Sequence, residues 1–206
     1  MFYDPRENPR PAPLRHNPFL TLVAPRPIGW VSTISSQGQA NLAPFSYFNG
    51  IGTSPPMVMF APNAQDKANT PKDTFRNISE VPEFVVNVAT YELREAVNET
   101  SRGYKFGVSE IEKAGLTAMP AVNVRPPRVK EAPAALECEV YQTVELPPGQ
   151  DGRQGHVVIG RVVGIYISDE LIDNGIVNQL GLQQLARLGS SYYSWVDEIF
   201  EMRRPK

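Results

Sequence analysis

The segment from residue 70 to residue 78, TPKDTFRNI, combines residue types that could bind an anion. Thr70 is a favoured N-cap residue, and Pro71 suits the first helical position because its missing N–H is not needed there. Asp73 could bond back to the Thr70 amide, as in a capping box. The pattern predicts a helix beginning at 70–71, whose free N–H groups favour a phosphate. The alternative is an ordinary capped surface helix.

Lys72 adds a full positive charge to the first turn of this predicted helix. A cation there opposes the helix dipole by roughly 0.3–1 kcal/mol, an unfavourable term that a nearby ligand anion would offset. We therefore interpret Lys72 as a candidate anion ligand. The alternative is a lysine whose ammonium group is solvated.

The sequence Trp30-Val31-Ser32-Thr33 places polar groups near the end of a predicted strand. Successive side chains of a strand alternate, so Trp30 and Ser32 share one face while Val31 and Thr33 share the other. Hydroxyl groups at a strand end could bind phosphate oxygens. The alternative is that Ser32 and Thr33 are ordinary strand residues.

The segment from residue 41 to residue 49, NLAPFSYFN, interrupts a strand-like run with Pro44. Proline cannot donate a ladder hydrogen bond, so Pro44 indicates a sheet edge or a bulge where backbone groups point outward. Outward N–H and C=O groups beside aromatic side chains could hold the polar rim of a flat heterocycle. The alternative is an edge strand whose aromatic side chains pack into the core.

Acid–base, nucleophilic and metal chemistry by side chains find little support in the sequence. His16 and His156 are the only histidines, and Cys138 is the only cysteine. These are too few for a metal cluster, although carboxylate ligands remain an alternative. We predict that Cys138 is a buried small apolar residue, that His156 lies at the surface where a strand begins, and that no side chain is catalytic.

The composition is that of an ordinary globular protein. The chain has 206 residues, with 20 Lys plus Arg, 22 Asp plus Glu and a net charge of −2. This balance argues against a nucleic-acid-binding face, and no apolar run approaches the ~20 residues of a membrane helix. One cysteine excludes an intramolecular disulfide, and the N-terminal MFYDPR lacks the apolar region of a signal peptide. We expect a cytoplasmic protein without nucleic-acid or membrane partners.

The elements that must position these residues are mostly strands. The proline-rich residues 1–19 predict an extended arm, and residues 20–203 a single domain onto which the apolar residues 19–23 pack. Gly160 and Gly164 should mark bends or bulges. Enrichment in β-branched and aromatic residues predicts strands at 28–34, 43–49, 57–61, 84–90, 135–146 and 157–168.

Helical periodicity is limited to short stretches at residues 93–100, 109–115 and 180–188. Helices of crossover length do not alternate with the strands, which disfavours a doubly wound α/β fold. We therefore expect a mainly β barrel with a few short helices.

Eight short segments, taken in order, carry a resemblance to a known family. They are residues 25–33, 41–49, 55–56, 72–77, 83–87, 114–116, 136–138 and 187–193. Together they resemble the flavin reductase-like family of FMN-binding split β-barrels, in its flavoprotein oxygenase and flavoredoxin branch. The resemblance covers roughly residues 20–203. It implies a Greek-key split β-barrel that forms a homodimer with FMN at the subunit interface.

The resemblance also implies a phosphate site. It places Ser32 and Thr33 near the FMN phosphate or ribityl chain, and it completes the phosphate site with Lys72, Thr74 and Asn77. Asp73 is left to helix capping, because a carboxylate would repel a phosphate.

The isoalloxazine ring would be lined largely by backbone groups of the second segment. Arg187 and Tyr192 belong to a loop, residues 187–193, that the resemblance places close to the flavin of the same or of the partner subunit. A position of His16 beside the neighbouring subunit's flavin is a further alternative. The residues expected around the ring are Trp30, Asn41, Ala43, Pro44, Phe45, Ser46, Phe48 and Asn49.

The activity implied is that of an FMN-dependent oxidoreductase, similar to NAD(P)H:flavin reductases. Hydride transfer between nicotinamide and flavin needs no dedicated acid or base residue, because the cofactor carries the chemistry. No G-x-G-x-x-G follows a strand, so a separate Rossmann site is absent. This leaves the reductase and an electron carrier both open, because a nicotinamide from NADH or NADPH can stack directly on bound flavin. The alternatives are an FMN-binding electron carrier served by a partner protein, an oxygenase with its own small organic substrate, and a non-flavin barrel used for interaction.

Overall fold

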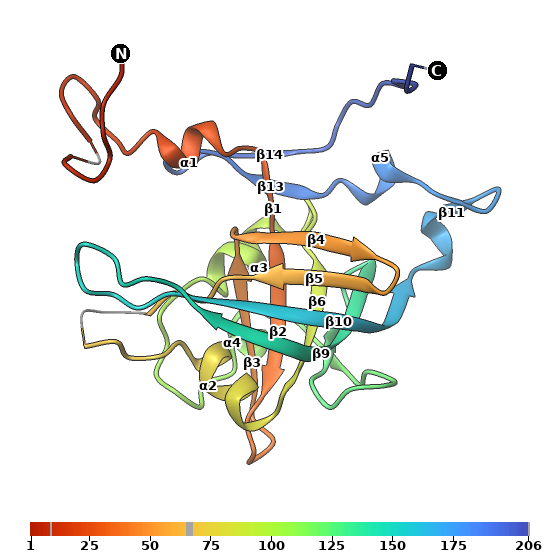
Figure 1. Cartoon of the computed structure of the whole chain (residues 1–206). Helices are drawn as coiled ribbons and strands as arrows, with labels where there is room; N and C mark the ends of the chain where they lie inside the picture. Colours follow the sequence, from red (N-terminus) through yellow and green to blue (C-terminus); the bar gives the residue numbers. More distant parts are fainter. Residues whose placement is uncertain (9, 65–67, 206) are drawn as a thin grey trace.

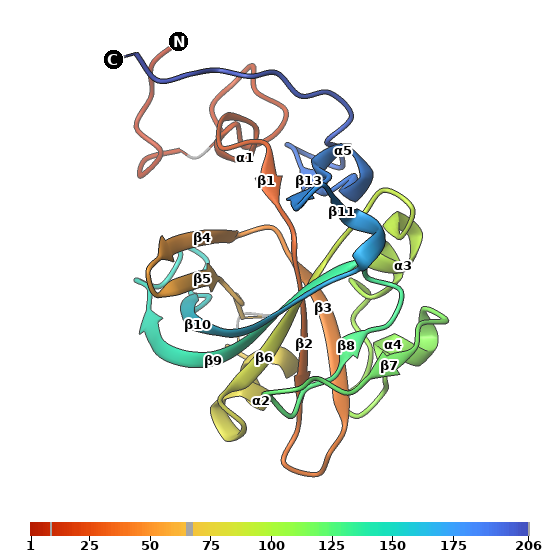
Figure 2. The same cartoon turned by 90° about the vertical axis from the view of Figure 1, so that its right-hand side faces the viewer.

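The computed structural model describes residues 1–8, 10–64 and 68–205. Seven antiparallel strands form the main sheet in the order β3-β2-β6-β9-β10-β5-β4 (Figure 1). The sheet curls into a barrel that is split between its edge strands β3 and β4, as the mainly β prediction required (Figure 2). The strands are β2 (Gly29–Ile34), β3 (Ala40–Phe45), β4 (Phe48–Thr53), β5 (Pro56–Phe60), β6 (Glu83–Val88), β9 (Ala134–Glu145) and β10 (His156–Ile167).

The predicted strand at residues 43–49 is wrong as a single element, because the chain bends at Ser46 and Tyr47. Phe45 ends β3 opposite Gly29, whereas Phe48 begins β4 opposite Phe60 on the far edge of the sheet. Pro44 lies in edge strand β3, as its missing N–H predicted. The bend therefore carries the chain across the split in the barrel.

The long β9–β10 hairpin confirms the two predicted irregularities. Its register shifts between Ile159 and Gly160 and again between Val162 and Gly164. A Cβ atom at Gly160 would lie 2.3 Å from Cζ of Phe84, so only glycine allows this close approach. The shifts bend the hairpin, which helps the sheet to curl.

Two apolar clusters cover the two faces of β2. Val31 packs inside the barrel with Phe45, Phe60, Phe84 and other residues, and the Phe45 and Phe60 ring centroids are 5.0 Å apart. Trp30 points to the other face, into a cluster that includes residues of α3 (Arg94–Glu99) and α4 (Glu110–Lys113). Cys138 lies fully buried in the barrel cluster, as predicted.

Helix α2 (Asp73–Glu80) begins later than predicted. Its N-cap residue is Lys72, whose backbone is extended with ψ 150°, and the Lys72 carbonyl accepts from Arg76 N at 3.0 Å. Lys72 and not Thr70 is the N-cap residue, so the capping box predicted for Thr70 and Asp73 is wrong, and the Lys72 side chain makes no capping hydrogen bond. The consequence is that Lys72 stands at the very start of the helix.

The C-terminal helix is much shorter than the predicted span of 180–188. Helix α5 (Gln179–Leu182) makes one turn and ends at Gln183, which has a left-handed φ of 44°. The chain then forms β13 (Leu185–Arg187), because Leu185 pairs with Trp195. The remaining short elements are η1 (Asp169–Leu171), β7 (Ala118–Met119), β8 (Arg128–Val129), β11 (Ile172–Asp173) and β12 (Ile176–Val177).

A small separate sheet joins the two ends of the chain. It has the order β1-β13-β14 and contains β1 (Arg26–Pro27) and β14 (Tyr193–Trp195). Both views place the chain termini on the same side of the barrel as this sheet (Figures 1 and 2).

The proline-rich arm, in which Pro9 lies outside the described residues, ends in one helical turn, α1 (Phe19–Leu22). The expected packing of residues 19–23 is wrong for their largest side chains, since Phe19 is 54% and Leu22 79% exposed. No helix in the described ranges is long and apolar enough to cross a membrane.

Candidate functional site

A cavity of about 260 Å³ lies where edge strand β3, the start of α2 and the loop after α3 meet. It brings together five of the predicted site residues, Asn41, Ala43, Pro44, Lys72 and Thr74. Segments more than 20 positions apart in the sequence therefore line one cavity. The cavity also contains residues outside the predicted set, namely Asp73, Thr100, Ser101, Arg102, Gly103, Tyr104 and Glu110.

Lys72 is the half-buried cation of this cavity. Its Nζ lies 5.4 Å from the centroid of the Phe45 ring. Burial lowers the pKa of its ammonium group, and among the described residues no carboxylate forms an ion pair with it. Together with the uncapped N-terminus of α2, Lys72 presents a positive region that an anion would stabilise.

Asn41, Thr74 and Glu110 form a buried network behind Lys72. The Asn41 amide and the Thr74 hydroxyl are 2.9 Å apart, and turning the amide lets its nitrogen donate to Glu110 Oε1 at 3.3 Å. Glu110 Oε2 accepts from Leu42 N at 3.1 Å. Burial raises the pKa of Glu110, and it also raises the pKa of Asp73. Because these acids ionise less readily than usual, they oppose a bound anion less than exposed carboxylates would.

The loop of residues 100–104 adds a second cation, Arg102, which the sequence analysis missed. Arg102 is held by Glu99, with Nε 2.9 Å from Oε1, and the Tyr104 hydroxyl donates to the same carboxylate. Thr100 accepts from Trp30 Nε1 at 2.8 Å, which fixes the start of the loop. An arginine between a serine and a glycine directly after a predicted helix was the signal that could have found this loop.

Ser32 and Thr33 do not line the cavity of Lys72, and their expected contact with a phosphate stays a prediction. Ser32 is fully buried, donates to the Pro127 carbonyl at 2.5 Å and accepts from Asn87 Nδ2 at 3.2 Å. Thr33 is also fully buried and accepts from Asn77 Nδ2 at 3.1 Å. Because both faces of β2 are covered, its polar side chains are interior groups with protein partners.

Trp30 and Asn77 are likewise interior residues. Trp30 is fully buried with its indole N–H on Thr100, and Asn77 is 2% exposed. The Asn77 Oδ1 atom is buried and has no hydrogen-bond partner among the described residues. Neither residue lines the cavity, and their expected contact with the cofactor stays a prediction.

The residues expected along the ring of the heterocycle lie at or beyond the rim. Phe45 is buried beneath Lys72, and Asn49 is exposed with its side chain on Gly50 N at 2.9 Å. Ser46 and Phe48 are half-buried at the bend between β3 and β4. Their backbone contacts to a flavin ring stay a prediction.

Arg187, Tyr192 and His16 lie outside the cavity. Arg187 packs on Tyr193, with Cζ 4.5 Å from the ring centroid, while Tyr192 is 71% exposed. His16 is exposed in the arm. The expected approach of Arg187 and Tyr192 to the flavin of the same or of the partner subunit, and of His16 to the neighbouring subunit's flavin, stays a prediction. His156 opens β10 and stacks on Phe75 with centroids 4.1 Å apart.

The described residues contain no group of three or more His, Cys, Asp or Glu side chains arranged to hold a metal ion. What the cavity offers is two cations, hydroxyl and amide groups, and the open start of a helix. This donor set fits a phosphate group, and the adjoining edge strand with Pro44 presents backbone groups that fit a polar ring edge.

The chain forms a split antiparallel barrel with a cavity at its edge strand β3. Residues 22–185 match the model of the flavin reductase like domain, and the chain therefore belongs to the flavin reductase-like family. Membership of this family makes the protein a flavoprotein of the oxidoreductase type.

Relatives agree with this assignment. An uncharacterised protein from Aquifex aeolicus is 42% identical over 175 residues, which are 84% of this chain and 86% of that protein. Nitrilotriacetate monooxygenase component B from Bacillus cereus is 31% identical with a TM-score of 0.88, and the match covers 98% of both chains. The 2-nitrobenzoate 2-nitroreductase NbaA from Pseudomonas fluorescens is 30% identical with a TM-score of 0.79, over 90% of this chain and 88% of that one.

Proposed function

We propose that the protein is an FMN-dependent oxidoreductase that accepts hydride from NADH or NADPH and passes the electrons to a small-molecule acceptor. The observation that supports FMN most directly is Lys72, a half-buried cation at the uncapped start of α2 that lacks an ion-pair partner in the described chain. A terminal phosphate would supply the missing negative charge. FAD and riboflavin lack such a terminal phosphate.

The chain's own residues bind and orient the cofactor. Lys72, Thr74 and the first N–H groups of α2 hold the phosphate, and Arg102 adds charge from the opposite wall. Asn41, fixed by Thr74 and Glu110, holds the edge of β3 in place for backbone contacts to the ring. When bound, the flavin supplies hydride and single-electron chemistry, so the protein needs no acid or base residue for hydride transfer.

The proposed active form is a homodimer in the cytoplasm. Large apolar side chains are exposed on the single chain, among them Ile51 on β4 at 50%, Ile176 on β12 at 72% and Phe200 at 81%. Ile176 and Phe200 line one hollow together, and grouped exposed apolar side chains of this kind favour a protein partner. Light scattering should give twice the chain mass. A monomer with full flavin affinity would contradict the dimer without affecting the cavity.

The function is tested with the protein as purified. Its absorbance should show oxidised flavin, and the flavin released on denaturation should be FMN. Rebinding of FMN should be stronger than that of riboflavin by about 1–3 kcal/mol, the contribution of a charge-assisted hydrogen bond. The protein should then be mixed separately with NADH and with NADPH. One of the two should reduce the flavin, seen as a loss of its oxidised absorbance.

Three outcomes would redirect the proposal. Equal affinity for FMN and riboflavin would remove the phosphate site from the cavity. Bound FMN that neither nicotinamide reduces would favour the electron carrier served by a partner protein. A colourless protein that leaves FMN fluorescence unchanged would contradict the flavin assignment altogether.

A further inference from the structure

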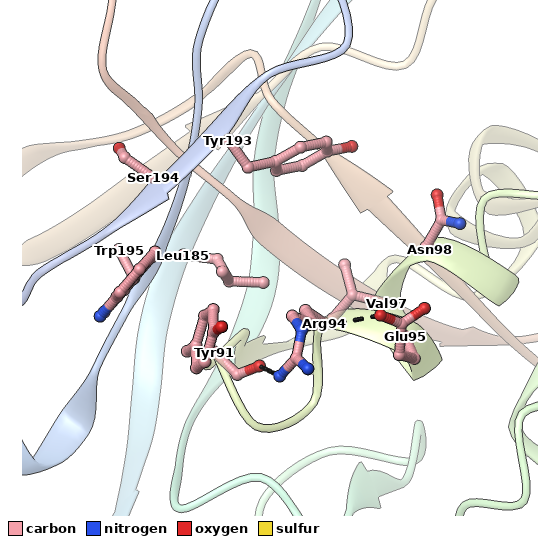
Figure 3. A pocket seen from close by; sticks show the side chains of 9 residues that line it. All are labelled: Tyr91, Arg94, Glu95, Val97, Asn98, Leu185, Tyr193, Ser194 and Trp195. Carbon is pink, nitrogen blue, oxygen red and sulfur yellow. Dashed lines mark hydrogen bonds and ion pairs between the residues drawn. The ribbon is translucent and has the colours of Figure 1, made fainter.

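A second pocket, of about 320 Å³, lies between α3 and the terminal sheet. Figure 3 shows Tyr193 on one side of the hollow and Tyr91 with Arg94 on the opposite side, with Leu185 and Val97 between them. Of its lining residues, only Tyr193 was singled out from the sequence, as the last residue of the loop 187–193. Its remaining lining residues are Glu95, Asn98, Ser194 and Trp195.

The aromatic residues of this pocket are held in fixed stacks. Tyr91 packs against Trp195 with ring centroids 4.3 Å apart, and the Arg94 guanidinium lies 4.3 Å from the Tyr91 centroid. Arg187 packs on Tyr193 but does not line the pocket. Tyr193 and Trp195 are nevertheless 43% and 39% exposed. Ordered aromatic faces that stay open to solvent are suited to stacking against another ring.

The floor and the rim of the pocket restrict the chemistry of a ligand. Val97 and Leu185 are buried and give an apolar floor. Arg94 donates to the Tyr91 carbonyl at 2.9 Å, and its Nε lies 3.6 Å from Glu95 Oε1, so part of its guanidinium stays free to donate. A planar ring with an oxygen acceptor would pack against the apolar walls with its ring and accept hydrogen bonds from the free N–H groups with its oxygen.

We propose that this pocket binds a small planar aromatic molecule that carries a carboxylate or carbonyl oxygen. The ring lies between Tyr193 and the Tyr91–Arg94 pair, and its oxygen accepts from Arg94. A hollow of this volume is at the lower end of the range for small-ligand sites, which suits one or two rings.

The position of the pocket gives it a role in the proposed reaction. Asn98 lines this pocket and Thr100 lines the cavity of Lys72, so each hollow has a lining residue near the end of α3. Residues two positions apart have Cα atoms within about 7 Å. An aromatic acceptor or donor held here is next to the flavin-binding cavity. This role rests on the proposed function, whereas binding of the aromatic ring does not.

The experiment measures binding of benzoate, with cyclohexanecarboxylate as the non-aromatic acid of equal charge. Isothermal titration uses the full-length protein, first as purified and then saturated with FMN. Benzoate should bind at least about fivefold more tightly than cyclohexanecarboxylate, because only the planar ring stacks. Tyr193→Ala should weaken benzoate about fivefold, and Tyr141→Ala, a change of an exposed tyrosine on β9, should not.

Arg94→Gln tests the polar contact separately. It should weaken benzoate about threefold more than it weakens benzamide, which is uncharged. Equal affinities for benzoate and cyclohexanecarboxylate would overturn the proposal. Benzoate binding that Tyr193→Ala leaves unchanged would also overturn it. Loss of benzoate binding on FMN saturation would assign the pocket to the flavin ring and overturn it too. Failure of FMN to bind while benzoate binds would instead contradict only the proposed function.

Discussion

Two clusters of polar residues lie on or beside neighbouring strands of the main sheet. They differ in the hydrogen-bond and ion-pair partners of their polar groups. Ser32 and Asn87, on the central strands, are fully buried and bond to Pro127, Trp30 and Val129. Lys72 and its neighbours, at the edge of the sheet, line a cavity, and Lys72 has no ion-pair partner in the described chain. Hydroxyl and amide groups are thus paired with protein groups in both clusters, and the difference is the Lys72 ammonium group, which remains available to a ligand.

The comparison shows that position in the sheet separates structural from ligand-binding polar groups. A central strand is covered on both faces, so an unpaired polar group there would be strongly unfavourable. An edge strand borders solvent, where water can solvate a polar group until a ligand binds to it. Changes in the interior cluster should therefore alter stability, and changes in the cavity should alter flavin affinity.

Asn87→Ala should give the largest stability change. Asn87 Nδ2 donates to the Trp30 carbonyl at 3.1 Å, and its Oδ1 accepts from Val129 N at 2.7 Å. Its loss leaves buried groups unpaired, so the free energy of unfolding should fall by about 3 kcal/mol in urea titrations. The exposed Asn49→Ala is the matched control and should stay within about 0.5 kcal/mol. Equal losses for the two would contradict the interior role.

Lys72→Ala should have the largest effect on the ligand. FMN affinity should weaken by about 1–3 kcal/mol in fluorescence titrations, because a charge-assisted contact to phosphate is lost. The flavin-free protein should not lose stability, since burial disfavours this ammonium group in the fold. Lys113→Ala, on the exposed side of α4, is the control. Unchanged FMN affinity would remove Lys72 from the site.

Ser32→Ala separates the two clusters most sharply, although its effect is smaller. It removes the hydroxyl between Pro127 and Asn87, so the unfolding free energy should drop by about 1 kcal/mol. FMN affinity of the folded protein should not change. A loss of FMN affinity without a loss of stability would restore the predicted phosphate role of Ser32 and break the comparison.

Glu110→Gln should give the smallest effect, visible as a pH dependence. Burial raises the pKa of Glu110 above its ordinary 4.5, so the folded state binds its proton more tightly than the unfolded state does. The stability that this contributes is fully present below pH 4.5 and is lost as the pH rises through the raised pKa. Glutamine cannot titrate, so the difference in unfolding free energy between wild type and variant should vary over that range. A difference in unfolding free energy that stays constant with pH would contradict the raised pKa of Glu110.

Local patterns in the sequence were sufficient for most of the fold. Alternation placed Cys138 inside the barrel, a missing N–H placed Pro44 at an edge, and two glycines marked the shifts in β10. Each of these depends on a residue and its near neighbours. The bend at Ser46 and Tyr47 was missed because it follows from closure of the barrel, which no local pattern encodes.

The site was less predictable because its polar groups find partners far along the chain. The carbonyl that accepts from Ser32 belongs to Pro127, 95 residues away, and Trp30 meets Thr100 at a separation of 70. Lys72, which lines the cavity, could be singled out from the sequence because a cation at a helix start is unfavourable by itself. Arg102 was missed because only the folded structure brings its loop beside β3, where the two line one cavity.

Arg26 has a practical consequence for anyone who wishes to shorten the protein. It is 6% exposed, and its guanidinium donates to the carbonyls of Leu20, Val23 and Leu188. A chain trimmed to residues 22–185, the stretch that matches the family, would lose two of these three acceptors and all of β14. A buried guanidinium without its hydrogen-bond acceptors destabilises the folded state. A trimmed gene should therefore begin before Leu20 and end after Trp195.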